Sequence, residues 1–141
     1  MIASLILWSH IMSASVEPMP AGLVERIAYV ETRSYRDDAG AWHYIDQRPG
    51  RDGEAGMCQM VVGTFRLIRN RLPRGTTFAD LRSPIVAAEA ARCYLEWLYE
   101  RTHDWDYATM CYNVGLRGRL VHAMRAESYL GAVKAAGKAS Q

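Results

Sequence analysis

Residues 23–34, LVERIAYVETRS, predict an amphipathic helix that carries a carboxylate on its apolar face. At about 100° per residue, one side of this helix is an apolar stripe that contains Leu23, Val24, Ile27 and Val30. Glu31 falls inside the stripe, whereas Thr32 lies on the side expected to face solvent. A carboxylate that faces a core is costly unless it is paired, binds a metal or stays protonated for a chemical task. Glu31 is therefore the first candidate functional residue.

Length and composition favour one globular domain. The chain has 141 residues, of which 50% are hydrophobic, so we expect a single domain over residues 1–141 with a core that needs no disulfide or metal. The net charge of +2 is too small to indicate nucleic acid, and no nucleic-acid partner is expected. An arginine-rich stretch, residues 65–75, is interpreted as a solvated helix face, with attraction to an anionic polymer as the alternative.

The chain has three cysteines, Cys58, Cys93 and Cys111. Their spacing matches no zinc site and no redox pair, and their odd number argues against a disulfide scaffold, although one bridge plus one free thiol stays open. A papain-like hydrolase would use Cys58 with His43, His103 or His122, and a zinc site would use His43 with Cys58. We favour a small apolar role for Cys58. No metal and no cofactor are expected.

The first sixteen residues, MIASLILWSHIMSASV, contain no charged side chain. A secretory signal would begin with a positive region, and the apolar run is too short to cross a bilayer as a helix. We therefore expect a buried first helix rather than a cleaved signal, and no stable membrane insertion.

The rest of the chain predicts further helices and one small hairpin. Residues 41–45, AWHYI, are typical of a short strand, and residues 48–53, RPGRDG, of a turn. Ser83 with Pro84 suits one helix start, and Asp104 or Asp106 suits another. In the first of these helices the inward positions are expected to include Ile85, Ala88 and Leu98. Helical patterns cover 57–72, 84–101, 106–115 and 127–136, with a short helix near Leu120.

Three later segments complete a pattern that begins with Glu31. They are GMCQM at 56–60, CYNVG at 111–115 and ESYLGAV at 127–133. In this order they resemble the soluble lytic transglycosylase (SLT) family of the lysozyme-like superfamily, whose catalytic Glu is followed by Gly-Leu-Met-Gln, Ala-Tyr-Asn-Ala-Gly and Tyr-Val segments. The resemblance implies a mainly α, lysozyme-like (goose-type) domain with a small β-hairpin or loop beside the active-site cleft.

The resemblance also implies an activity and a set of site residues. The substrate would be peptidoglycan glycan strands, cleaved between N-acetylmuramic acid and N-acetylglucosamine with formation of a 1,6-anhydro ring. Glu31 would act first as general acid and then as general base, with Tyr129 forming a hydrogen bond near it. The backbone at Met57 and Cys58 would contact the substrate. The cleft-lining side chains would be Gln59, Tyr112 and Asn113.

The chemistry of the residues supports an acid at position 31 and leaves a second carboxylate open. Burial penalises the charged form, so a carboxyl in an apolar wall keeps its proton to higher pH, as glycosidic cleavage requires. The loop after Glu31 is long and acidic, with Asp37, Asp38, Asp46, Asp52 and Glu54. A hydrolytic muramidase that uses Glu54, aided by Asp52, is therefore the alternative enzyme.

The biological setting is expected to be a bacteriophage protein that degrades the cell wall. Partners would be peptidoglycan and other virion or tail proteins, and the location would be the virion or the host periplasm and wall. A secreted bacterial periplasmic enzyme is one alternative. An inactive lysozyme-fold structural or wall-binding virion subunit is the other, and it conflicts with the costly inward carboxylate of Glu31.

Overall fold

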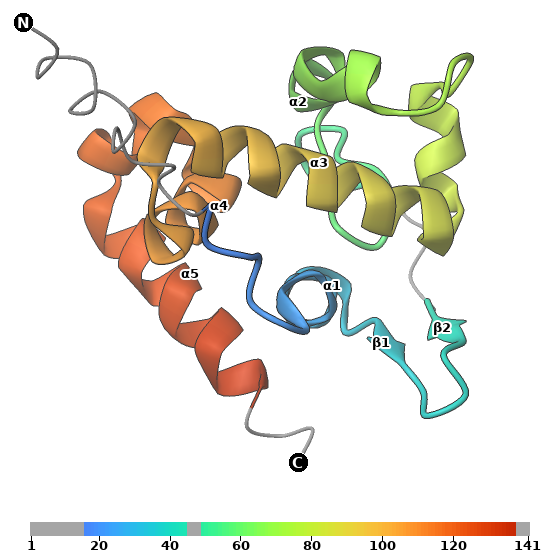
Figure 1. The fold of residues 1–141 in the computed structure, drawn as a ribbon, viewed down its shortest axis with the longest axis horizontal. Helices are drawn as coiled ribbons and strands as arrows, with labels where there is room; N and C mark the ends of the chain where they lie inside the picture. The colour runs from blue at the N-terminus through green and yellow to red at the C-terminus, as the bar shows by residue number, and fades with distance from the viewer. Residues whose placement is uncertain (1–15, 45–48, 138–141) are drawn as a thin grey trace, which may run out of the picture.

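The computed structural model describes residues 16–44 and 49–137. Two short strands, β1 (Tyr35–Arg36) and β2 (Trp42–His43), pair antiparallel to form a small hairpin. The prediction of a mainly helical fold with a small hairpin is confirmed (Figure 1). The helices are α1 (Leu23–Thr32), α2 (Val62–Ile68), α3 (Pro84–Thr102), α4 (Trp105–Val121) and α5 (Ala123–Ala136), with 3₁₀-helices at Arg69–Arg71 and Phe78–Arg82.

Helix α3 runs through the centre of the core. It packs against α1, α2 and α4, and α5 covers α1 and α4 (Figure 1). Pro84 occupies its first turn, as predicted, but Ser83 forms no side-chain capping bond. Ile85 is 75% exposed, so its predicted inward position is wrong. It lies two residues before buried Ala87 and hence on the opposite side of the helix.

Helix α4 contains a kink that the sequence partly predicted. Asp104 caps its start, because the carboxylate accepts a 2.8 Å hydrogen bond from the amide of Tyr107. Gly115 was expected to end the helix, with a short helix near Leu120. The non-helical φ 74° and ψ 166° of Gly115 do interrupt α4, and a second helical stretch follows the kink and runs to Val121. Helix α5 then begins at Ala123, earlier than the expected start at residue 127.

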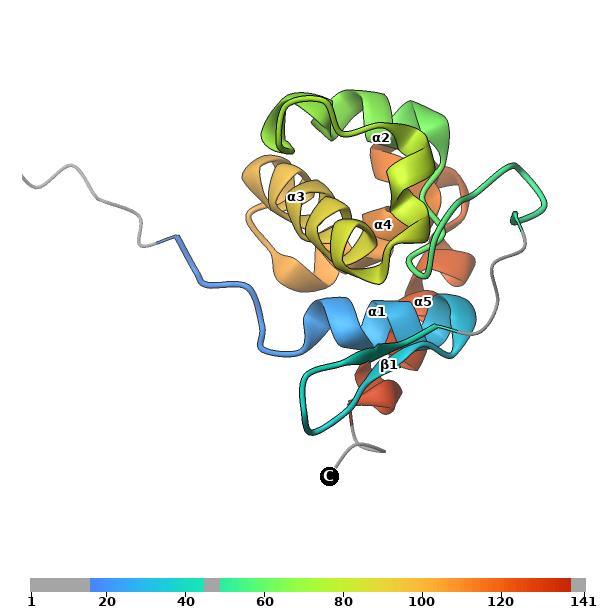
Figure 2. The ribbon, with the colours of Figure 1, turned by 90° about the vertical axis from the view of Figure 1, so that its right-hand side faces the viewer.

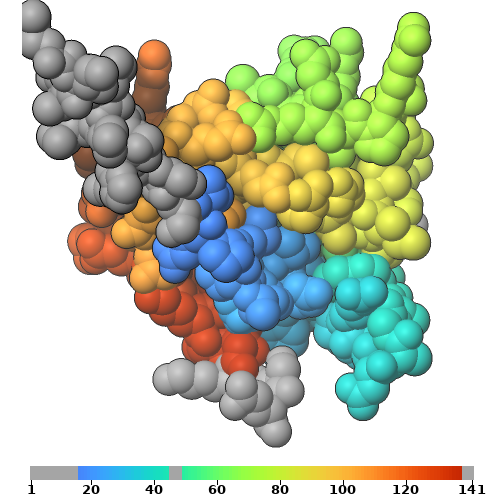
Figure 3. All heavy atoms as spheres, viewed as in Figure 1, coloured from blue at the N-terminus to red at the C-terminus, as the bar shows by residue number. Residues whose placement is uncertain are grey.

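The segment between the hairpin and α2 is a loop, and it carries part of the site. The helix predicted from residue 57 begins only at Val62. Ala55 and Met60 form a bridge with backbone hydrogen bonds of 2.9 and 3.1 Å, which closes residues 56–59 into a turn. Figure 2 shows this loop and the end of α4 on one side of the molecule, and Figure 3 shows the hairpin as a lobe that projects beside α1 and α3.

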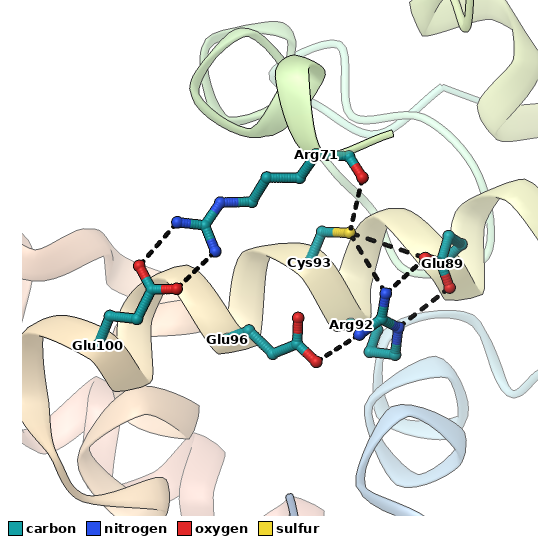
Figure 4. Close-up of polar contacts among 6 residues, drawn as sticks. All are labelled: Arg71, Glu89, Arg92, Cys93, Glu96 and Glu100. Atoms are coloured by element: carbon teal, nitrogen blue, oxygen red, sulfur yellow. Dashed lines mark hydrogen bonds and ion pairs between the residues drawn. The ribbon is translucent and has the colours of Figure 1, made fainter. Parts of the chain in front are cut away.

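Charged side chains of α3 form a network of ion pairs with one another and with Arg71 (Figure 4). Arg71, from the arginine-rich stretch, forms a bidentate pair with Glu100, both bonds 2.7 Å long. Arg92 pairs with Glu89 and Glu96 on the same helix. Exposed pairs of this kind contribute at most about 1 kcal/mol each. The network shows that Arg71 is engaged within the protein.

The helix predicted for the first sixteen residues lies, apart from Val16, outside the described residues. Within 16–44 and 49–137, none of the helices is both long enough and apolar enough to span a membrane.

Candidate active site

Glu31 lies in the last turn of α1, where the helix meets α5. Leu23, Ile27 and Ala28 of this helix are buried in the core. Arg33, the residue that follows the helix, adopts the left-handed conformation with φ 60° and so terminates it. Glu31 is half-buried, and its Oε1 accepts a 2.7 Å hydrogen bond from the hydroxyl of Tyr129 on α5. Among residues 16–44 and 49–137, the partner of this inward-facing carboxylate is therefore a neutral hydrogen-bond donor, and none of them forms an ion pair with it.

The surroundings of Glu31 hold its proton more tightly than water would. Burial raises the pKa of Glu31, and the charge of Glu54 raises it further. The hydrogen bond from Tyr129 and the charge of Arg125 lower that pKa, but burial is the largest effect. Burial and the charge of Glu31 raise the pKa of Tyr129, so its hydroxyl stays a hydrogen-bond donor. The raised pKa of Glu31 favours the protonated carboxyl that a general acid needs.

Thr32 ties the end of α1 to the turn at 56–60. It is half-buried, so its predicted solvent-facing position is wrong. Its hydroxyl lies 2.8 Å from the carbonyl of Met57 and 2.6 Å from the hydroxyl of buried Ser34. The same hydroxyl lies 3.2 Å from the carbonyl of Ala28 in its own helix, so Thr32 links α1, Ser34 and the 56–60 turn next to Glu31.

Gly56 permits the turn that presents Gln59. Its φ is 74°, and a Cβ at this position would lie 2.2 Å from the backbone oxygen of Leu81. Only glycine allows both the conformation and this close approach. Gln59 itself adopts φ 50°, and its side-chain amide donates a 3.0 Å hydrogen bond to the carbonyl of Gly56. The turn thereby holds the Gln59 side chain in one orientation.

The kinked part of α4 supplies the opposite wall. The hydroxyl of Tyr112 donates a 3.0 Å hydrogen bond to the carbonyl of Cys58, which fixes the helix to the turn. Asn113 accepts a 2.9 Å hydrogen bond from Nε of Arg125 on α5. The kink at Gly115 follows directly, so the chain turns at the rim of this wall.

These segments enclose a cavity of about 370 Å³. It contains both candidate carboxylates and is otherwise lined by polar, aromatic and aliphatic residues and one glycine. The lining residues are Glu31, Glu54, Gln59, Met60, Val61, Thr64, Tyr94, Tyr112, Asn113, Val114, Gly115 and Arg125.

The structure brings most of the predicted site residues together. The predicted residues that line the cavity are Glu31, Glu54, Gln59, Tyr112 and Asn113, and Tyr129 contacts Glu31 directly. Met57 and Cys58 are 0% and 1% exposed and do not line it. Their carbonyls accept hydrogen bonds from Thr32 and Tyr112. The substrate contacts expected of this backbone stay a prediction.

Several residues of the cavity lining were not among the site residues predicted from the sequence. For two of them, Arg125 and Tyr94, a feature of the sequence does point to the site. Arg125 precedes Tyr129 by four residues, so helical spacing puts both on the same face of α5. Tyr94 is followed by Leu95 in the helix that begins after Ser83, where the family that the sequence resembles carries a Tyr-Leu pair. Thr64 and Val114 have no such signal, because they enter the lining only through the turn and the kink.

The cysteines are structural. All three are buried and free, so the alternative of one disulfide is wrong. Burial raises the pKa of the Cys58 thiol strongly, which disfavours the thiolate that a papain-like nucleophile needs. His43 is paired with Asp37 in the hairpin at 2.7 Å. Among the described residues no cluster of His, Cys, Asp or Glu could hold a metal ion.

Comparison with known proteins gives one match. A family model described as the transglycosylase SLT domain matches residues 18–130. No curated protein and no solved structure matches the chain. The matched range covers most of the chain and every residue that lines the cavity.

Proposed function

The chain belongs to the transglycosylase SLT domain family, a lysozyme-like family of peptidoglycan lytic transglycosylases, and on this premise we propose that it cleaves glycan strands with Glu31 as its only catalytic carboxylate. The bond would be the β-1,4 link between N-acetylmuramic acid and N-acetylglucosamine. The observation that carries the proposal is the half-buried Glu31, hydrogen-bonded by Tyr129, in the wall of a polar cavity.

Glu31 would act twice. Protonated Glu31 gives its proton to the glycosidic oxygen while the bond to C1 of the muramic residue breaks and positive charge develops on that sugar. The resulting carboxylate takes the proton of the 6-hydroxyl of the same residue, whose oxygen bonds to C1 and closes the 1,6-anhydro ring. No water is consumed, and Glu31 regains its proton.

The surroundings of Glu31 suit both steps. Burial raises the pKa of Glu31, which favours the protonated carboxyl that the first step requires. The hydroxyl of Tyr129 donates to the carboxylate, which stabilises the charged form present between the two steps. Gln59 and Asn113, on opposite walls, would hold the sugar by hydrogen bonds across the cavity.

A hydrolytic muramidase is the second candidate because Glu54 lines the same cavity as Glu31. A hydrolase needs a second carboxylate to act as nucleophile or to activate water. Glu54 accepts a 2.8 Å hydrogen bond from the amide of Asp52 in its own loop. Its charge also raises the pKa of Glu31, a role that it can play without touching the substrate.

The test is loss of wall lysis on Glu31→Gln, measured by the turbidity of purified peptidoglycan. Glu25→Gln is the matched control, since Glu25 lies on the same helix but pairs loosely with Arg36 at 3.9 Å, away from the cavity. We expect Glu31→Gln to lose at least about 10³-fold in rate and Glu25→Gln to stay near wild type. Normal lysis by a folded Glu31→Gln protein would refute the mechanism.

The bacteriophage setting stays a prediction with its own test. Peptide mass spectrometry of purified virions should detect the protein if it acts from the particle. Detection only in the lysate of infected cells would indicate a lysis role, and detection in uninfected bacteria would indicate a bacterial periplasmic enzyme.

A further inference from the structure

Arg125 is a cation in the cavity that the proposed reaction does not use. It lies in the first turn of α5 and lines the same cavity as Glu31. Its Nε donates to Oδ1 of Asn113 at 2.9 Å, which holds the guanidinium against the wall formed by α4. Helical spacing puts it on the same face of α5 as Tyr129, the partner of Glu31.

Most of the hydrogen-bonding capacity of Arg125 is unused. A guanidinium has five N–H donors, and the bond to Asn113 uses one of them. Within residues 16–44 and 49–137, no carboxylate forms an ion pair with Arg125, and its side chain is exposed. The free edge of this planar group has the geometry to bind a carboxylate through two parallel bonds.

The cavity lining holds one basic side chain, Arg125, and two acidic ones, Glu31 and Glu54. Arg119, on the neighbouring helix, stacks on the ring of Tyr107 at 4.5 Å and is not part of the lining. Glu31 accepts the hydrogen bond of Tyr129, and Glu54 lies in the loop before α2. An anionic group on a bound polymer is therefore attracted to Arg125 and repelled near Glu54.

We propose that Arg125 forms, in the cavity lining, a carboxylate-binding subsite that recognises the acidic substituents of the glycan strand. This inference rests on the proposed function, because it takes the substrate to be a strand of alternating amino sugars. Two sources supply the same carboxylate chemistry. One is the lactyl carboxylate of a muramic residue without its stem peptide, and the other is a carboxylate of the stem peptide itself.

The test measures binding, which needs no turnover. All proteins carry Glu31→Gln, so that the strands stay intact. The dissociation constant is measured for three proteins: the single variant Glu31→Gln, the double variant that adds Arg125→Gln, and the double variant that adds Arg74→Gln. Arg74 is the matched control, because it is an exposed arginine outside the cavity and its change removes the same charge.

Four strand preparations distinguish the sources. Strands stripped of stem peptides by an amidase carry free lactyl carboxylates, and their methylamide derivatives carry none. Intact strands carry stem-peptide carboxylates, and coupling them to methylamine removes that charge. Each charged preparation thus has a neutral partner with the same sugar backbone.

Arg125→Gln should raise the dissociation constant about tenfold for the strands that carry the carboxylate bound by Arg125. For the methylamide derivative of the same strands, in which that carboxylate is blocked, the dissociation constant should rise less than twofold. A loss only with stripped strands assigns the lactyl carboxylate, and a loss only with intact strands assigns the stem peptide. Equal losses on charged and neutral strands, no loss on either, or the same loss for Arg74→Gln would overturn the subsite. Failure of the proposed function would be separate, since it would appear as wild-type protein that binds strands without cleaving them.

Discussion

The hydroxyl of Tyr129 donates a 2.7 Å hydrogen bond to Oε1 of Glu31, and the two residues are 98 positions apart in the chain. This bond joins α5 to the end of α1 beside the cavity that Glu31 lines. It opposes the effect of burial on the same carboxyl, because burial favours the protonated form and the hydrogen bond favours the charged form. A group that must both give and accept a proton benefits from this balance.

Removing the Tyr129 hydroxyl should move the pH profile to higher pH. Tyr129→Phe deletes a hydrogen bond that lowers the pKa of Glu31, so that pKa rises. Glu31 acts first as an acid, and activity is lost as pH rises through its pKa, so the alkaline limb of kcat/KM shifts upward. We also expect kcat to fall about tenfold, a part of the roughly 10²–10⁴-fold that general acid catalysis contributes. An unchanged or downward-shifted limb would mean that Tyr129 does not act on Glu31.

Removing the charge of Glu54 should shift the profile in the opposite direction. Glu54 raises the pKa of Glu31, so Glu54→Gln lowers that pKa and moves the alkaline limb to lower pH. Because the proposed reaction needs one carboxylate, kcat at the optimum should stay within about tenfold of wild type. Asp38→Asn, in the exposed hairpin, is the control for loss of one acidic charge. Complete loss of activity on Glu54→Gln alone would favour the hydrolytic muramidase.

The raised pKa of Glu31 also predicts how stability depends on pH. A folded-state pKa above the unfolded value, about 4.3 for Glu, means that the native state binds the proton more tightly. Wild-type stability therefore falls as pH rises from that value through the raised pKa. Glu31→Gln keeps the acceptor for Tyr129 without the charge, so it should melt at a higher temperature than wild type at pH 8 and at a similar temperature at pH 3. A variant that is less stable at both pH values would contradict the burial of the charge.

Gly56 should tolerate no side chain. Gly56→Ala puts a Cβ 2.2 Å from the oxygen of Leu81 at a residue with φ 74°, so we expect a loss of roughly 2–4 kcal/mol in the free energy of unfolding. Gly63→Ala is the matched control, because Gly63 lies in α2 with open space around its Cα. There, alanine should stabilise by about 0.5–1 kcal/mol. Urea denaturation measures both changes, and equal effects would show that the 56–60 turn is not constrained as described.

The sequence predicted the parts of the site that depend on local pattern. The apolar stripe of residues 23–30 was sufficient to turn Glu31 inward, and Asp104, one of the two candidate caps, starts α4. Tertiary contacts decided the rest. Thr32 faces inward because the 56–60 turn offers it the carbonyl of Met57, which a helical wheel does not include.

Tertiary contacts also explain the helix boundaries and side-chain orientations that were predicted wrongly from the sequence. Residues 57–61 have an apolar pattern that suits a helix, yet the Ala55–Met60 bridge holds them in a turn. Ile85 has the residue type of a core position, but it lies on the opposite side of α3 from buried Ala87. Arg125 has the charge of a surface residue, and its hydrogen bond to Asn113, a contact between two helices, holds it in the cavity lining.

The single-carboxylate mechanism is tested most sharply by mass spectrometry of the fragments that wild-type protein and Glu31→Gln release from purified peptidoglycan. Wild-type products should be about 18 Da lighter than the corresponding hydrolytic fragments, since the ring closes without water, and Glu31→Gln should release none. Wild-type fragments with free reducing ends would show that water is the acceptor, and would contradict a mechanism that uses Glu31 alone.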